Sequence, residues 1–159
     1  MAVGMATAES ILRANFEEFN NGSDEIIGHF TYVVCGDGDF QEPVVLGAGS
    51  MAGHWGLSRL IVYYDSNNAQ ISGKVDRSDS TNYSQVFEGF GWHVQEIDGH
   101  DHEKIREAIE KAQVVDSPSL IIGNTIMAKG AANVEGDHET HGAPLDLSLI
   151  HISEPTRPY

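Results

Sequence analysis

The sequence predicts an α/β protein in which one parallel sheet carries helices on both faces. Short apolar runs without a period-2 alternation recur along the chain, which is typical of strands that are buried on both sides. Segments with helical periodicity separate these runs, and strands that alternate with helices favour parallel pairing. The length of 159 residues is enough for one domain with a core of its own.

The first part of the chain supplies two of the expected helices and two strands. Residues 1–19 carry apolar side chains among good helix formers, and Asn20-Asn21-Gly22 ends that helix. Residues 30–35 form an apolar run that we interpret as a buried strand. Residues 44–55 are small and apolar with three glycines, and we interpret them as a tightly packed helix although glycine weakens helices. Residues 60–64 are expected to form a second buried strand.

The second part of the chain repeats this alternation. Residues 83–90 are expected to form a short helix, and residues 92–97 a third strand. Residues 102–115 give the clearest helical pattern, because their apolar side chains make a single stripe. Residues 120–126 are expected to form the fourth strand.

The composition excludes several classes of partner. A net charge of −15 argues against nucleic-acid backbones and anionic membranes, which need surfaces rich in Lys and Arg. It still allows a small phosphorylated ligand that a metal ion and backbone N–H groups hold. The single cysteine, Cys35, excludes an internal disulfide and favours a reducing compartment. No apolar run approaches the ~18–20 residues of a membrane span, so a cytoplasmic protein is expected.

Two strand ends carry the residues from which we expect chemistry. Gly36-Asp37-Gly38 follows the first strand, and Asp65-Ser66-Asn67-Asn68 follows the second. The 28 residues from 39 to 66 leave room for one helix and one strand, so both ends can meet at the same edge of the sheet. A carboxylate, an amide oxygen and a backbone carbonyl suit Mg²⁺ or Ca²⁺. Each motif alone is more typical of a plain turn, and it is their joint occurrence that predicts a site.

The same residues resemble the cofactor motif of thiamine-diphosphate enzymes, and further segments resemble transketolases in particular. The resemblance covers about residues 1 to 146, and its most discriminating match is "HGAPL", from His141 to Leu145. The other matching segments are "GDGDFQE", "MAGHWGLSRLIVYYDSN", "FEGFGWHVQEIDGHD" and "SPSLI".

The resemblance implies a site as well as a fold, namely a truncated diphosphate-binding domain of the thiamine-diphosphate-binding fold. Asp37 and Asn67 would be side-chain ligands of Mg²⁺ or Ca²⁺, and Ala69 would give its backbone carbonyl to the same metal. Gly38 would contact the diphosphate of the cofactor through its N–H. His141, the candidate catalytic residue, would reach both the diphosphate and the hydroxyls of the sugar donor.

The resemblance also implies an activity, which is the transfer of a two-carbon ketol group between a ketose phosphate and an aldose phosphate. The complete enzyme would be a cytoplasmic homodimer of the pentose phosphate pathway that binds sugar phosphates. This chain alone is expected to be inactive. Two alternatives stay open. One is another thiamine-diphosphate enzyme, such as a 1-deoxyxylulose-phosphate synthase or a keto-acid decarboxylase. The other is a non-catalytic, cofactor-free subunit or interaction fragment.

Three positions depart from the family's pattern. Pro43 stands where glycine commonly follows the motif glutamate, Glu42, and proline suits the first turn of a helix. Gly47 stands where a second glutamate usually belongs to a chain of carboxylates between two active sites, so that chain is broken or rerouted. Asp39 stands where an uncharged residue is common, and the sequence gives no account of it.

Both ends of the chain are expected to be cut. The chain begins inside a helix that follows a glycine-rich, cofactor-contacting segment in the family. The native domain is expected to cover residues 1–146. Residues 147–159, which include "LSLIHISEPTR", resemble no part of transketolase and are expected to be a non-native, adapter-derived tail. The alternative is a terminal strand at 147–152.

Overall fold

A computed structural model describes residues 1–19, 26–71, 73–131 and 133–145. Its centre is a four-stranded parallel sheet with the strand order β1-β2-β4-β3. The strands are β1 (Thr31–Gly36), β2 (Leu60–Ser66), β3 (His93–Asp98) and β4 (Ser119–Asn124). All four predicted strands are therefore present, and the predicted parallel sheet is confirmed. The expected tail at 147–159 lies outside the described residues.

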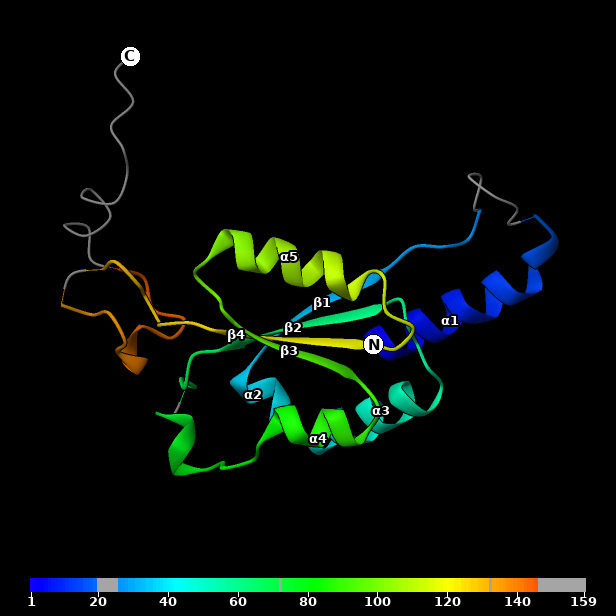
Figure 1. Ribbon diagram of the computed structural model, residues 1–159. Coiled ribbons are helices and arrows are strands. Elements are labelled where there is room, and N and C mark those ends of the chain that lie inside the picture. The colour runs from blue at the N-terminus through cyan, green and yellow to red at the C-terminus, as the bar shows by residue number, and fades with distance from the viewer. Residues whose placement is uncertain (20–25, 72, 132, 146–159) are drawn as a thin grey trace, which may run out of the picture.

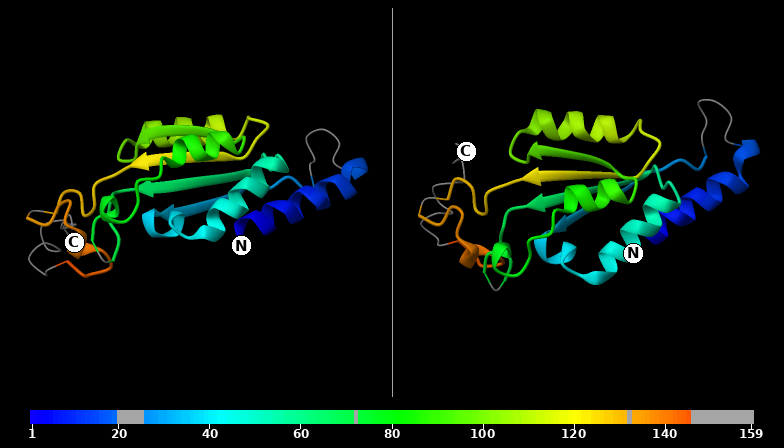
Figure 2. Two further views of the ribbon diagram at one scale, coloured as in Figure 1. Left: turned by 90° about the horizontal axis from the view of Figure 1, so that it is seen from below. Right: turned by 60° about the horizontal axis from the view of Figure 1, so that its bottom comes forward.

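Helices cover both faces of the sheet, as predicted. Figures 1 and 2 show α5 on one face and α1, α3 and α4 on the other. The helices are α1 (Ala2–Asn15), α2 (Asp37–Phe40), α3 (Pro43–His54), α4 (Tyr83–Gly89) and α5 (His102–Ala112). Short 3₁₀ turns are η1 (Glu17–Phe19), η2 (Val75–Arg77) and η3 (His138–Thr140). The expected helix at 1–19 is thus a helix followed by a 3₁₀ turn, and the one expected at 102–115 ends at Ala112.

The segment after β1 differs from the simple turn that Gly36-Asp37-Gly38 suggests. It continues as the one-turn helix α2, and the Asp39 carboxylate accepts a hydrogen bond of 2.9 Å from the Gly36 N–H. This contact satisfies an N–H group that the start of a helix otherwise leaves unpaired. It explains the presence of Asp39, which sequence analysis left unexplained. Pro43 occupies the first turn of α3, as expected from its fixed φ.

The hydrophobic core has one cluster on each face of the sheet. On the α5 side, Ile61 and Ile121 pack with Ala108 and Ala112. The other side holds the larger cluster, which is rich in aromatic rings. Its buried members are Ala6, Phe40, Ala52, Leu57, Leu60, Val62, Tyr64, Tyr83, Phe87, Trp92, Leu120 and Ile122.

The expectation that the strand at 30–35 is buried is wrong for one of its faces. In β1, Tyr32 is 52% exposed and Val34 is 77% exposed. Both lie on the α5 side of the sheet, because Tyr32 pairs in register with Ile61. β1 is an edge strand, whereas α5 packs against β3 and β4.

Among the described helices, none is long and apolar enough to cross a membrane.

Candidate functional site

The two predicted strand ends lie side by side. β1 and β2 are neighbours in the sheet, and Gly36 pairs in register with Asp65. The Ala69 N–H donates to Asp37 Oδ2 at 3.3 Å and to Asn67 Oδ1 at 3.0 Å. The two acceptor oxygens can therefore lie no further apart than the sum of these distances, about 6.3 Å. The fold thus brings together the carboxylate and the amide that the sequence singled out.

Hydrogen bonds to both oxygens fix the Asp37 side chain, which is only 4% exposed. Oδ1 accepts from the Tyr64 hydroxyl at 2.6 Å, and Oδ2 accepts from the backbone N–H groups of Asn67 at 3.2 Å and Ala69 at 3.3 Å. Burial, followed by this hydrogen bond to Asp37, raises the pKa of Tyr64, so its hydroxyl stays a donor. The Tyr64 ring stacks on Phe40 with 4.2 Å between centroids, which anchors the donor in the core.

The carboxamide of Asn67 is oriented from both sides. Its Nδ2 donates to Asp65 Oδ2 at 3.0 Å, while its Oδ1 accepts from the Ala69 N–H. The Thr125 hydroxyl, just past β4, donates to Asp65 Oδ1. Sequence reasoning missed these supporting roles. Tyr64 looked like a core residue of a strand, Asp65 was part of the motif without a role, and no local pattern pointed to Thr125.

The donor set suits a hard divalent cation. One carboxylate and one amide oxygen are ligands that Mg²⁺ and Ca²⁺ prefer. Within the residues that the structure describes, no group of three or more His, Cys, Asp or Glu side chains gathers as a metal-binding cluster. A site here consequently depends on neutral oxygens beside Asp37. A Cβ added at Gly38 would meet nothing within 4 Å, so there is open space beside its backbone for a phosphate group.

His141 comes from a different part of the chain. It is exposed and directly follows η3, where its N–H donates to the His138 carbonyl at 3.0 Å. Figure 2 shows the segment after β4 beyond the carboxyl ends of the strands, at the end of the sheet where α2 begins. In the described part of the chain, His141 makes no hydrogen bond with Asp37 or Asn67.

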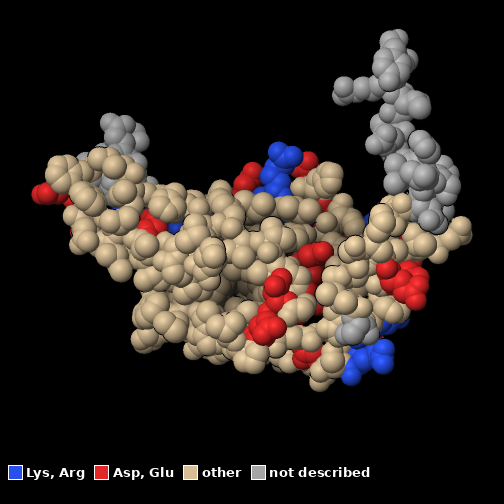
Figure 3. Space-filling model, turned by 180° about the vertical axis from the view of Figure 1, so that it is seen from behind, with Lys and Arg blue, Asp and Glu red and all other residues tan. Residues whose placement is uncertain are grey.

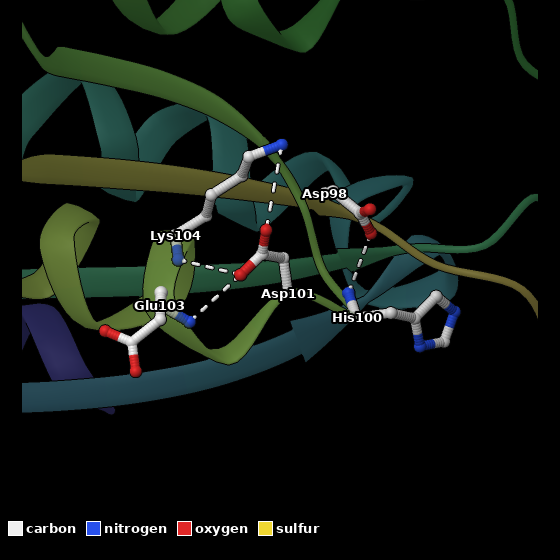
Figure 4. Close-up of polar contacts among 5 residues, drawn as sticks. All are labelled: Asp98, His100, Asp101, Glu103 and Lys104. Atoms are coloured by element: carbon white, nitrogen blue, oxygen red, sulfur yellow. Dashed lines mark hydrogen bonds and ion pairs between the residues drawn. The ribbon is translucent and has the colours of Figure 1, made fainter.

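The third strand end, after β3, is structural. Asp98 accepts a 2.9 Å hydrogen bond from the His100 N–H, and this bond lowers the pKa of Asp98 (Figure 4). Asp101 caps α5 by accepting from the N–H groups of Glu103 at 3.0 Å and Lys104 at 3.2 Å. This segment is thus a turn followed by an acidic N-terminal cap of α5.

A hollow of about 750 Å³ lies elsewhere, between the start of α1, β1 and α3. Figure 3 shows a hollow on this side of the molecule with acidic side chains beside it. Its lining is mainly apolar and includes Cys35, Asp39 and Glu42, but not Asp37 or Asn67. Burial and the nearby Asp39 charge raise the pKa of the Cys35 thiol, which disfavours the thiolate that a nucleophile needs.

Comparison with known proteins gives a consistent result. The family model described as "Transketolase, thiamine diphosphate binding domain" matches residues 1–154. A transketolase of Geobacillus stearothermophilus is 45% identical over 156 residues, which are 97% of this chain and 23% of that protein. Transketolase 1 of Vibrio parahaemolyticus is 45% identical over 150 residues, which are 94% of this chain and 22% of that protein. The chain therefore spans about a quarter of the length of these relatives.

Solved structures show the same likeness. The crystal structure of a Campylobacter jejuni transketolase matches with a TM-score of 0.80 and 41% identity, over 94% of this chain and 24% of that one. A Pichia stipitis transketolase in complex with sedoheptulose-7-phosphate matches with a TM-score of 0.83 and 34% identity, over 91% of this chain and 21% of that one.

Proposed function

Because this chain belongs to the transketolase family, we propose that it holds the diphosphate and the divalent cation of thiamine diphosphate. The complete enzyme then transfers a two-carbon ketol group between sugar phosphates. The observation that carries the proposal is the shared hydrogen bond of the Ala69 N–H, which joins Asp37 and Asn67 at the ends of neighbouring strands. Burying the Asp37 carboxylate without a cation beside it is costly, because a buried charge needs a partner of opposite sign as well as hydrogen bonds.

The proposed ligands of the cation are Asp37, Asn67 and the backbone carbonyl of Ala69, and the cation is Mg²⁺ or Ca²⁺. Gly38 contacts the diphosphate through its N–H. A cation is needed here because the chain carries a net charge of −15 and would repel a free diphosphate. Asp37 contributes the one negative charge among these ligands, so it dominates the attraction for the cation.

Thiamine diphosphate, when bound, supplies the stabilisation of a carbanion that ketol transfer requires. The residues of this chain bind and orient that cofactor. Asp37 and Asn67 fix the cation end, and His141 contacts the diphosphate and the hydroxyls of the donor sugar. The stacking of Tyr64 on Phe40 keeps the Asp37 end of the site rigid.

The sugar phosphates are proposed as substrates because the related Pichia stipitis transketolase was solved with sedoheptulose-7-phosphate. We further propose that the complete enzyme is a cytoplasmic homodimer of the pentose phosphate pathway. The alternative, a cofactor-free interaction fragment, is distinguished by direct binding measurements.

Isothermal titration calorimetry tests the proposal. Thiamine diphosphate is titrated into the purified chain with and without Mg²⁺, and binding is expected only with the metal. The Asp37→Ala variant is expected to abolish this binding. Asp98→Ala is the matched control, because it removes the same charge from the end of β3 without touching the proposed ligands. Metal-independent binding, or equal binding by the Asp37→Ala variant, would contradict the assignment.

A further inference from the structure

The orientation of the Asn67 carboxamide decides whether this residue can serve a cation. Its oxygen is a ligand, whereas its NH₂ group carries only donors and would repel a metal ion. A rotation of the terminal amide by 180° exchanges the two. A useful amide ligand therefore needs a neighbour that accepts from the nitrogen and thereby fixes the oxygen in place.

Asp65 is placed to do this. A carboxylate accepts hydrogen bonds and donates none, and Asp65 Oδ2 lies 3.0 Å from Asn67 Nδ2. The opposite end of the amide, Oδ1, accepts from the Ala69 N–H at 3.0 Å, beside Asp37. Both contacts would be lost if the amide were turned over. Its oxygen would then face the Asp65 carboxylate, which is also an acceptor, and its NH₂ group would face the Ala69 N–H, which is also a donor.

Asp65 is itself held by the neighbouring strand. Its Oδ1 accepts from the Thr125 hydroxyl, and the Thr125 N–H donates to the Ser66 carbonyl at 3.0 Å. The second bond fixes the Thr125 backbone against the end of β2. A continuous chain of hydrogen bonds thus runs from the end of β4 through Asp65 to Asn67.

We propose that Asp65, anchored by Thr125, is a positioning residue that presents the Asn67 oxygen to the cation. This inference rests on the proposed function of the site. Neither Asp65 nor Thr125 is among the proposed ligands of the cation. The inference predicts that Asp65 acts through Asn67 and contacts neither the cation nor the substrate.

A purely electrostatic effect is the competing explanation, because the Asp65 charge would attract a cation wherever its carboxylate points. The Asn67→Asp variant separates the two. A carboxylate at position 67 has oxygens at both ends, so its orientation no longer matters. Removal of Asp65 in that background relieves a repulsion between adjacent carboxylates. Positioning therefore predicts a loss of affinity only with Asn67, whereas attraction or direct ligation predicts a loss in both backgrounds.

The experiment uses Mn²⁺ as the probe, because carboxylate and carbonyl oxygens suit Mn²⁺ as they suit Mg²⁺. Electron paramagnetic resonance of free Mn²⁺ gives its dissociation constant in the presence of saturating thiamine diphosphate. We expect Asp65→Ala to weaken Mn²⁺ binding about tenfold, as removal of a ligand's hydrogen-bond partner typically does. Thr125→Val, which changes no charge, is expected to cause a smaller loss. Asp98→Ala is expected to cause none, and urea unfolding checks that each variant is folded.

The outcomes separate this inference from the proposed function. Mn²⁺ binding by the unaltered chain with no loss in Asp65→Ala or Thr125→Val would overturn the positioning role and leave the metal site standing. A loss of equal size in the Asn67→Asp background would also overturn it, in favour of direct charge attraction. No Mn²⁺ binding by the unaltered chain would overturn the metal site and this inference together. If Asp65→Ala does not fold, Thr125→Val in the two backgrounds gives the same comparison.

Discussion

Two glycines of helix α3 should respond oppositely to the same substitution. A Cβ at Gly53 would lie 1.9 Å from the Phe90 carbonyl oxygen, 2.9 Å from the Phe90 carbonyl carbon and 3.2 Å from Trp92 Cδ1. A Cβ at Gly47 would meet nothing within 4 Å. Both residues lie within Pro43–His54, so alanine favours the helical backbone at each position, by less at Gly53 because it is next to the last residue of the helix. The main difference between the two positions is the packing.

The magnitude follows from that packing. An ordinary carbon–oxygen contact is about 3.3 Å or longer, so α3 must move more than about 1 Å away from Phe90 in the Gly53→Ala variant. Overpacking of this kind costs about 1–3 kcal/mol. The movement also strains the 2.8 Å hydrogen bond from Trp92 Nε1 to the Gly49 carbonyl. The gain of about 0.5–1 kcal/mol for replacing a helical glycine by alanine offsets part of this cost.

We therefore expect Gly53→Ala to lower the free energy of unfolding by about 1–2 kcal/mol. Gly47→Ala should raise it by about 0.5–1 kcal/mol. Urea unfolding followed by circular dichroism measures both values. An unchanged slope of the free energy of unfolding against urea concentration checks that only stability has changed. Equal stabilisation by the two alanines would refute the reasoning, because it would mean that α3 does not pack against Phe90 as described.

Three further predictions concern the site and its surroundings. In a complete enzyme that contains this domain, Asp37→Ala should abolish cofactor binding, whereas His141→Ala should mainly slow turnover; equal losses of cofactor affinity in calorimetry would contradict these roles. The purified 159-residue chain should show no ketol transfer in a coupled assay with xylulose 5-phosphate and ribose 5-phosphate, because it spans only 23% of the length of a related transketolase; turnover that depends on Asp37 would show otherwise. Hydrogen bonds from Thr81 and Tyr83 lower the pKa of Asp79 below its ordinary 3.8, so its stabilising contribution is present above that pH and is lost as the pH falls through the lowered value. The free energy of unfolding of Asp79→Asn should accordingly differ most from that of the unaltered chain near neutral pH, and the two should converge in acid. A difference that stays constant across this pH range would argue that ionisation of Asp79 does not contribute to stability.

The amino-acid sequence was sufficient to predict the order and kind of the main elements and the two motifs of the site. Periodicity and turn chemistry are local, so the stripe in 102–115 and the apolar run at 60–64 were enough to predict α5 and β2. The adjacency of Asp37 and Asn67 followed from a general rule on the carboxyl ends of parallel strands. Periodicity and turn chemistry are properties of short segments, so they can be recognised in a sequence before its fold is known.

The residues that surround those motifs became known from the folded chain. The position of β4 beside β2 brings Thr125 to Asp65 across 60 positions of sequence, and no local pattern marks such a pair. The edge position of β1 leaves Val34 exposed although its sequence is that of a buried strand. The hydrogen bond from Tyr64 to Asp37 likewise depends on which face of β2 meets α2. Strand order and the packing of distant segments depend on the free energy of the whole chain. The pattern of any one segment therefore does not predict them.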